Sequence, residues 1–485
     1  MTLSRDFLKN FLCLALLLYS GAHFLSSSGL SPNSAIGGDF ISGFPSFWAW
    51  KFNPKMIQEN PSVQGWMGGQ YLELNEELCS GKNIPKGENV AIDTIVQPPK
   101  VCREYMRQKQ LSPDQPLLPI QVVNRTWQYG PMMHFVTFPL MFLKSFSTAL
   151  RAWYFVCLIA YLCLFYLWYD LLFRSRGLSS FSAFCLFSGL WFNFSPSYDA
   201  LRGAEIEILE FLFLTLSLWY AAKKKSIKAG AALALSVFMK YTPLVFVPYF
   251  LWRRQYKIVA SACLFMAGLW VVTQATLGWE WSYSFRMLQK IGAGTTATGS
   301  QAFSSLIYRL FTNFDLFNDS TSQLARLPVT NTATAQLITK IFALSLIAFY
   351  GILFLLRRGK EVMDVELSLI SLLMVTLIQW NHIYYLIFLL MGYSVALSSI
   401  FKRVKTTGII PKLESGVLFA SLVLVGYFLP GSLYHRVFAP LKLNFWDAYS
   451  VLSLPVYGYS ILLVWLTVKI VKQSGEPLWV RENHF

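Results

Sequence analysis

The sequence is poor in charged residues, and this scarcity restricts the class of protein to which it can belong. Only 14% of the 485 residues are charged, whereas 55% are hydrophobic. A soluble domain carries about 25% charged residues. Apolar runs of the roughly 20 residues that a membrane-spanning helix needs recur along most of the chain. A soluble enzyme with one membrane anchor is therefore excluded, and the fold class predicted is an all-α polytopic membrane protein.

The chain also lacks the short motifs of several enzyme classes. It has no Ser-His-Asp order, HExxH, P-loop or GxGxxG, so nothing indicates a hydrolase, a metalloprotease or a nucleotide-dependent enzyme. The seven cysteines show no zinc spacing, and no carboxylate cluster requires a metal. We expect no cofactor. A disulfide between Cys79 and Cys102 stays open, because sequence alone does not place their Cα atoms.

Acidic residues are the scarcer charged kind, with 25 Asp and Glu against 41 Lys and Arg. The basic residues form short clusters between apolar runs, which is typical of cytoplasmic loops and argues against nucleic-acid binding. The stretch 30–128 instead holds nine basic and nine acidic residues, as an external loop would. Both chain ends are predicted to be cytoplasmic. The basic clusters are Arg174/Arg176, Lys223/Lys224/Lys225/Lys228, Arg253/Arg254/Lys257, Arg357/Arg358/Lys360, Lys402/Arg403/Lys405 and Lys469/Lys472.

Hydropathy divides the chain into five segments and predicts about twelve transmembrane helices. A thirteenth is open, because 130–149 is apolar enough to span but is interpreted as re-entrant or interfacial. A cleaved signal peptide is the less favoured alternative for the first helix. The segments are a first transmembrane helix (1–29), a long external loop with interfacial helices (30–128), a central transmembrane module with a recessed hairpin (129–277), a second external loop (278–333) and the C-terminal transmembrane helices (334–485).

Two apolar stretches have basic clusters on both flanks, which requires an in–out–in hairpin. The halves of 227–252 are too short to cross a bilayer comfortably, so the turn at Lys240-Tyr241-Thr242-Pro243 is expected to lie recessed within the outer leaflet. The hairpin 364–401 turns at Gln379-Trp380-Asn381-His382. Broken helices are tolerated where protein or water covers the freed backbone groups. Both hairpins therefore predict one water-accessible cavity that opens outward.

Asp39 and Lys240 are the leading candidates for chemistry. Asp39 follows two glycines just after the first helix, where partial desolvation of the carboxylate suits a general base; a turn residue that caps the next helix is the alternative. Lys240 lies in an apolar hairpin, where an ammonium group is costly and a lipid phosphate is a natural counter-ion. Its alternative is a side chain that extends to the membrane surface.

Five further side chains are weaker candidates. Arg202 and Glu207 lie at the outer end of a helix and suit phosphate binding, or form a local pair that caps the helix. His382 lies at the second recessed turn and either binds phosphate or a sugar hydroxyl, or is satisfied by Asn381. Gln301 and Arg309 lie in the second loop, where an ordinary solvated loop is the alternative.

The order of these motifs resembles the GT-C superfamily of membrane glycosyltransferases, and it is most similar to the glycosyltransferase family 87 type. The resemblance extends in pattern from about residue 30 to 392. The motifs that carry it are Gly38-Asp39-Phe40, Tyr129-Gly130-Pro131, Lys240-Tyr241-Thr242-Pro243, Gln301 and Trp380-Asn381-His382. The chain departs from the family where Gly203-Ala204-Glu205-Ile206 replaces a Gly-Gln-x-Asn motif and where one histidine replaces Trp-x-His-His.

The resemblance implies an inverting transfer of a sugar, mannose or another hexose or a pentose, from a polyprenyl-phosphate donor to a lipid or glycan acceptor. It implies Asp39 as the catalytic base and Lys240, His382 and Arg202 around the donor phosphate. The substrate-binding residues would be Glu207, Gln301, Asn381, Tyr129 and Arg309. Such a cell-envelope enzyme is expected in a bacterial inner or plasma membrane, among membrane lipids, with its active site on the external or periplasmic face. The alternative is a transporter or flippase of a lipid-linked or anionic substrate, since broken helices also mark transporters.

Overall fold

The computed structural model describes residues 5–27, 131–143, 146–277, 300–312, 329–357, 363–378, 382–426 and 453–472, and these parts are almost entirely helical. In these described parts, β-type pairing is limited to one antiparallel bridge between Thr312 and Val329. The helices that begin before residue 260 are α1 (Arg5–Ser27), α8 (Met132–Thr137), η3 (Phe138–Phe142), α9 (Phe146–Tyr169), η4 (Asp170–Arg174), α10 (Phe181–Phe192), α11 (Ser195–Gly203), α12 (Glu207–Ala222), α13 (Ser226–Met239), η5 (Thr242–Val245), α14 (Phe246–Trp252) and α15 (Tyr256–Leu277). The later helices are α17 (Phe303–Arg309), α18 (Thr332–Leu356), α19 (Met363–Leu377), η6 (Ile383–Phe388), α20 (Leu389–Thr407), α21 (Lys412–Val425) and α24 (Leu454–Lys472). The predicted all-α class is confirmed.

Six helical stretches of the described chain are long and apolar enough to cross a membrane, which indicates an integral membrane protein. The predicted count of twelve or thirteen spans is not established, because helices such as α12, α19 and α21 contain only 16, 15 and 14 residues. The six stretches are Lys9–Ser27, Thr148–Arg174, Tyr256–Thr276, Thr332–Leu356, Ile383–Thr407 and Leu454–Lys472.

The apolar segment 130–149 does not form one long helix in its described part. Residues 131–143 contain the six-residue α8 followed by the five-residue 3₁₀ helix η3, which has Pro139 in its first turn. At a rise of about 1.5 Å per residue, α8 is far shorter than a bilayer is thick. This geometry favours the re-entrant or interfacial interpretation over a thirteenth span.

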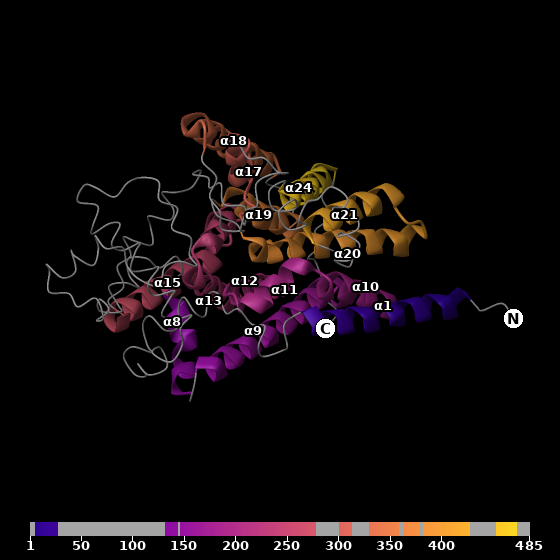
Figure 1. Ribbon diagram of the computed structural model, residues 1–485, viewed down its shortest axis with the longest axis horizontal. Coiled ribbons are helices and arrows are strands. Elements are labelled where there is room, and N and C mark those ends of the chain that lie inside the picture. The colour runs from indigo at the N-terminus through magenta and orange to yellow at the C-terminus, as the bar shows by residue number, and fades with distance from the viewer. Residues whose placement is uncertain are drawn as a thin grey trace.

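Helices α1, α20 and α21 run along the long axis of the molecule, which has two distinct ends (Figure 1). The N-terminal end of α1 and the turn between α20 and α21 lie at one end, to the right in Figure 1, and the C-terminal end of α15 lies at the other. Contacts between residues far apart in the sequence bring basic clusters together at the first of these ends. Lys405 Nζ donates to Gly177 O at 2.7 Å, and Lys223 Nζ lies 4.0 Å from Asp170 Oδ2. We call this the basic end, because the basic clusters of the described chain fall there, and the opposite end the site end.

Close backbone packing joins α13 to α15. Gly230 of α13 has no side chain, and a Cβ atom built there would lie 2.6 Å from both Ile258 O and Ala262 N of α15. Small residues let helix backbones approach closely in membranes, where packing rather than the hydrophobic effect drives helix association. Gly230 thereby fixes α13, the helix that directly precedes Lys240.

The helix breaks predicted from the sequence are present at the site end. Helix α13 stops at Met239, Lys240 is extended with φ −154° and ψ 140°, and η5 and α14 continue the chain. Between α19 and α20 the described chain resumes at His382 and passes through η6. Pro243 accounts for the first break, since proline removes a backbone donor and clashes with the preceding turn.

A third break positions the start of α12. Helix α11 ends at Gly203, and the next residue, Ala204, adopts the left-handed conformation with φ 49°. The backbone N–H of Glu205 donates to Ala200 O at 2.9 Å, and the indole Nε1 of Trp153 on α9 donates to Ala204 O at 2.7 Å. The orphan carbonyl groups of the turn are thus satisfied inside the protein. The turn sets the direction in which Glu207 enters α12.

At the basic end, α19 begins with two buried carboxylates that clamp neighbouring helices. Glu366 is fully buried; both Nε and Nη2 of Arg253 donate to its carboxylate, the Nε–Oε2 distance being 3.0 Å. Tyr249 OH donates to the same carboxylate at 2.8 Å. Asp364 pairs with Arg176 at 3.0 Å. Carboxylates at a helix N-terminus also favour the helix dipole, so this arrangement joins α14, α19 and the segment after η4.

Candidate active site

Two predicted site residues form a buried ion pair at the site end. Lys240 Nζ lies 2.6 Å from Glu207 Oε1, and the residues are 8% and 0% exposed. Lys240 is the residue directly after α13, and Glu207 is the first residue of α12. A charge-assisted hydrogen bond of this length compensates part of the cost of burying both charges. The sequence alternative was a local pair between Arg202 and Glu207. In the structure the carboxylate of Glu207 binds Lys240 instead.

The short turn between α12 and α13 explains why these two residues meet. Lys224 lies at this turn with φ 58°, and α12 packs along α13. Residues 207 and 240 are about equally far from the turn in sequence, so antiparallel helices bring them to the same level. This equal spacing is a sequence signal that would have identified the pair.

An aromatic residue of the second hairpin covers the ammonium group. Lys240 Nζ lies 4.0 Å from the ring centroid of Tyr385 in η6, a cation–π contact. The rings of His382 and Tyr384 stack with centroids 5.2 Å apart, and Tyr384 stacks on Tyr385 at 5.6 Å. His382 therefore lies next to the aromatic group that contacts Lys240. The structure brings together three candidates that are up to 175 residues apart in sequence.

Glu210, one turn after Glu207, holds the broken segment in place. It is fully buried, and its carboxylate accepts a hydrogen bond from Thr242 of η5. Ser236 Oγ on α13 donates to Glu210 O at 2.8 Å. These contacts fix both sides of the break around Lys240, so the position of the ammonium group is set by α12 on two successive turns.

Helix α11 packs against η6 and carries Arg202, which is exposed, and Asp199, which sequence analysis did not identify. One carboxylate oxygen of Asp199, Oδ2, is buried without a hydrogen-bond partner among the described residues. Burial raises the pKa of Asp199 to about 6, and the nearby Arg202 guanidinium lowers it in part. The i, i+3 spacing of Asp199 and Arg202 is the signal that would have pointed to it.

The end of α1 is held beside this helix. His23 Nδ1 lies 2.9 Å from Tyr198 OH and 3.1 Å from Asn193 Oδ1, and Asn193 Nδ2 donates to Ser20 Oγ at 2.7 Å. The chain therefore leaves α1 at the site end, next to α11. Asp39 follows twelve residues after the last residue of α1, Ser27.

Gln301 and Arg309 are not solvated loop residues, in contrast to the alternative drawn from the sequence. Their exposed fractions are 2% and 7%. Arg309 Nη1 donates to Ser300 O at 3.0 Å, and Nη2 donates to Ser453 Oγ at the start of α24. Tyr459 OH donates to Gln301 O at 3.4 Å. Arg309 thus joins α17 to α24, while Asp39, Tyr129 and Asn381 lie outside the described residues.

A family comparison identifies the class of the protein. The profile of glycosyltransferase family 87 matches residues 127–379, just over half of the chain. The chain belongs to glycosyltransferase family 87. It is therefore a glycosyltransferase, and no finding supports the transporter or flippase alternative. No curated protein and no solved structure matches the chain.

The match covers most of the candidate site but not all of it. Arg202, Glu207, Lys240, Gln301 and Arg309 lie inside residues 127–379. Asp39 precedes the family 87 match, and His382 follows it. In the parts of the chain that the structure describes, no group of three or more His, Cys, Asp or Glu residues has the geometry of a metal site. The ion pair at the helix break lies inside the matched region.

Proposed function

We propose that this family 87 enzyme transfers a sugar, with inversion, from a polyprenyl-phosphate donor to a lipid or glycan acceptor. The observation that carries the proposal is the buried Lys240–Glu207 pair at a helix break within the family-matched segment. Ionisable groups inside a membrane protein are costly and mark functional sites. A donor with a phosphate leaving group and an apolar tail suits a cationic site recessed among membrane helices.

The proposed reaction is a single displacement at the anomeric carbon. The carboxylate of Asp39 takes the proton of an acceptor hydroxyl, and the acceptor oxygen forms a bond to the anomeric carbon. The bond between that carbon and the phosphate oxygen breaks, and its electron pair stays on the phosphate. The donor phosphodiester carries one negative charge and the released phosphomonoester carries up to two. The site must therefore stabilise about one additional negative charge, which is the kind of term that dominates enzymatic rate enhancement.

Lys240, His382 and Arg202 are the proposed phosphate-binding residues. The ammonium group of Lys240 donates to Glu207, and its positive charge would attract a phosphate group. Glu207 would then act mainly by orienting Lys240, rather than by binding sugar. Arg202 is exposed on α11, which packs on η6 next to His382, and a guanidinium group binds phosphate in a bidentate manner. These placements support a shared phosphate site.

Gln301, Arg309, Asn381 and Tyr129 are proposed to bind the sugar or the acceptor. Burial of Gln301 and Arg309 between α17 and α24 supports a role in shaping the pocket wall. We further propose mannose as the transferred sugar, with another hexose or a pentose as alternatives, and a cell-envelope acceptor. The site would face the external or periplasmic side of a bacterial inner or plasma membrane, because the basic clusters lie at the opposite end.

The first test is transfer by the purified full-length protein in detergent. The protein is incubated with radiolabelled polyprenyl-phosphate mannose and a membrane-lipid acceptor pool, and in parallel with the glucose and arabinose donors. We expect transfer from one of these donors, a product of inverted anomeric configuration, and a loss of at least about 100-fold in Asp39→Asn. Asp170→Asn, at the basic end beside Lys223, serves as the matched carboxylate control outside the proposed chemistry.

The outcomes separate the class of donor from the role of Asp39. Retained anomeric configuration contradicts the single displacement. Transfer that persists in Asp39→Asn contradicts its assignment as the base. A chain that transfers sugar only from a nucleotide donor contradicts the polyprenyl-phosphate proposal while leaving family membership intact.

A further inference from the structure

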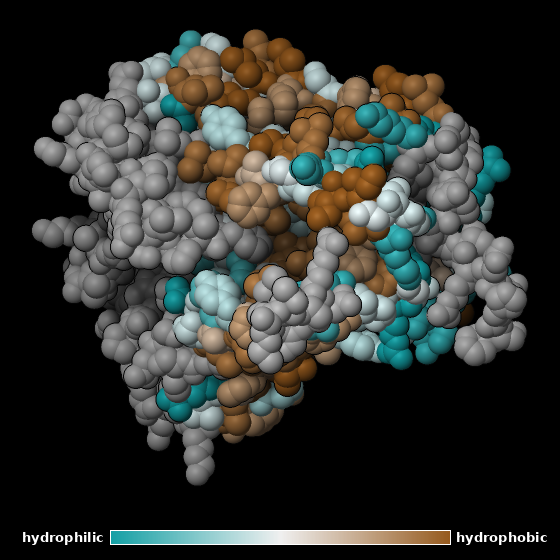
Figure 2. Space-filling view, turned by 90° about the vertical axis from the view of Figure 1, so that its right-hand side faces the viewer, coloured by the Kyte–Doolittle hydropathy of each residue, from teal (hydrophilic) through white to brown (hydrophobic). Residues whose placement is uncertain are grey.

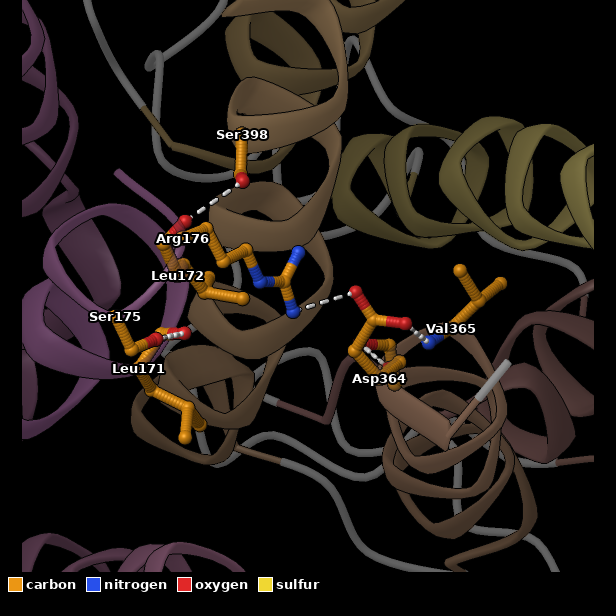
Figure 3. Close-up of polar contacts among 8 residues, drawn as sticks. Leu171, Leu172, Ser175, Arg176, Asp364, Val365 and Ser398 are labelled. Carbon is orange, nitrogen blue, oxygen red and sulfur yellow. Dashed lines mark hydrogen bonds and ion pairs between the residues drawn. The ribbon is translucent and has the colours of Figure 1, made fainter. Parts of the chain in front are cut away.

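A small cavity lies at the basic end, far from the candidate active site. Its volume is about 50 Å³, and it forms where the segment after η4 meets the start of α19, the middle of α20 and the last turns of α24. Figure 3 shows the guanidinium group of Arg176 directed at the carboxylate of Asp364, beside the helix that carries Ser398. The lining residues used below are Arg176, Asp364, Ser399, Lys402, Trp465 and Lys469.

The lining of this cavity is rich in positive charge. Three of its side chains are cationic and one, Asp364, is a carboxylate. Glu414 forms an ion pair with Lys469, with Nζ and Oε2 3.1 Å apart, and its Oε1 accepts a hydrogen bond from Arg403 Nη1 at 2.8 Å. Among the described residues, the second carboxylate therefore comes with a further cation, Arg403, and positive charge is in excess around the cavity.

Two of the three cations, Arg176 and Lys469, are held in position and partly shielded from water, whereas Lys402 is exposed. Asp364 holds Arg176 at 3.0 Å, and their side chains are 13% and 1% exposed. Lys469 is 19% exposed and its Nζ lies 5.1 Å from the Trp465 ring centroid. Partly buried charges are screened less by salt than exposed ones, and side chains that are already ordered lose little entropy when an anion binds. The hydroxyl group of Ser399 adds a neutral donor.

Exposed apolar side chains lie on α24, which lines the cavity, and in the turn that follows α20. On α24, Val464, Val468 and Val471 are 63%, 42% and 57% exposed. In the turn between α20 and α21, Ile409 and Ile410 are 71% and 61% exposed. Figure 2, which faces the basic end, shows hydrophilic and hydrophobic surface side by side there. Because α24 is long and apolar enough to span a bilayer, its exposed apolar face would meet acyl chains.

We infer that this cavity binds the phosphate group of an anionic phospholipid. Three clustered cations and a hydroxyl group would bind a phosphate group, whether it belongs to a lipid or to a soluble phosphate. The exposed apolar face of α24 favours the lipid, since it would take the acyl chains. Basic pockets between membrane helices are a known means of binding anionic headgroups. The site is separate from sugar transfer and does not depend on the donor.

Native mass spectrometry of the full-length protein in detergent tests this inference. Dioleoyl phosphatidylglycerol and dioleoyl phosphatidylcholine are titrated separately, and inorganic phosphate is added as a competitor. We expect the anionic lipid to bind at least about fivefold more tightly than the zwitterionic one. Lys402→Gln should weaken its binding about fivefold, and Lys402→Arg should restore it.

Lys412→Gln is the matched control, because Lys412 is an exposed lysine at the start of α21 at the same end of the molecule but does not line the cavity. It should leave lipid binding almost unchanged. Since Lys402 is exposed, Lys402→Gln should fold, and its elution on size exclusion checks this. Equal binding of the two lipids, or equal loss in Lys402→Gln and Lys412→Gln, overturns the inference. Inorganic phosphate that displaces the lipid at equal concentration would assign the cavity to a soluble phosphate instead.

Discussion

Two buried ion pairs, one at each end of the helical bundle, use similar groups in different ways. At the basic end, Arg253 holds Glu366 with two N–H groups and Tyr249 adds a third donor. At the site end, Lys240 contacts Glu207 through its single ammonium group, at a helix break and under an aromatic ring. Arginine fixes geometry through a rigid fork, whereas lysine is a compact point charge on a flexible stem. The comparison indicates a clamp at one end and a ligand-binding group at the other.

The largest effect is expected when the clamp formed by Arg253, Glu366 and Tyr249 is broken. Arg253→Gln leaves the fully buried Glu366 with one cation fewer, and removal of one partner of a buried pair costs about 3–5 kcal/mol. We expect a lower free energy of unfolding, measured by thermal unfolding in detergent, and unchanged transfer per folded molecule. Arg254→Gln, at the exposed neighbouring position, should change stability by less than about 0.5 kcal/mol. Equal stability of the two variants would contradict the clamp.

A smaller effect is expected in the pH dependence of folding stability at the site end. Burial raises the pKa of Asp199 from 3.8 to about 6, so the folded protein binds this proton more tightly than the unfolded chain does. Stability should therefore fall as pH rises between about 4 and 6, by about 1–3 kcal/mol from this group. Asp199→Asn should remove that slope and be more stable than the parent at neutral pH. Unfolding midpoints at pH 4 to 7 measure this, and parallel curves for the two proteins would contradict it.

The sequence predicted where the helices break better than it predicted which side chains contact each other there. The breaks near Lys240 and His382 followed from short apolar halves between basic clusters, and Pro243 marked one of them. A proline and a lysine within an apolar run are local signals that need no tertiary information. For this reason the break at Lys240 and the position of His382 before η6 agree with the prediction.

The pairing of Glu207 with Lys240 was missed because it depends on how α12 and α13 lie side by side. The sequence suggested Arg202 as the nearer partner of Glu207, since the two are close in the chain. The Tyr385 ring over Lys240 depends on contacts between two hairpins over 140 residues apart, for which no local pattern exists. Burial of Gln301 and Arg309 was missed for the same reason, because their polar composition is typical of a solvated loop.

The most direct test of the account is sugar transfer by two matched double variants. Lys240→Gln with Glu207→Gln removes the pair at the site end, and Arg253→Gln with Glu366→Gln removes the pair at the basic end. Neither double variant leaves an uncompensated buried charge from its own pair, so both should fold. We predict that kcat/KM falls by about 100-fold or more in the first, the loss typical of removing transition-state charge stabilisation, and stays within about threefold in the second. Full transfer by the first double variant, or an equal loss in both, would contradict the account.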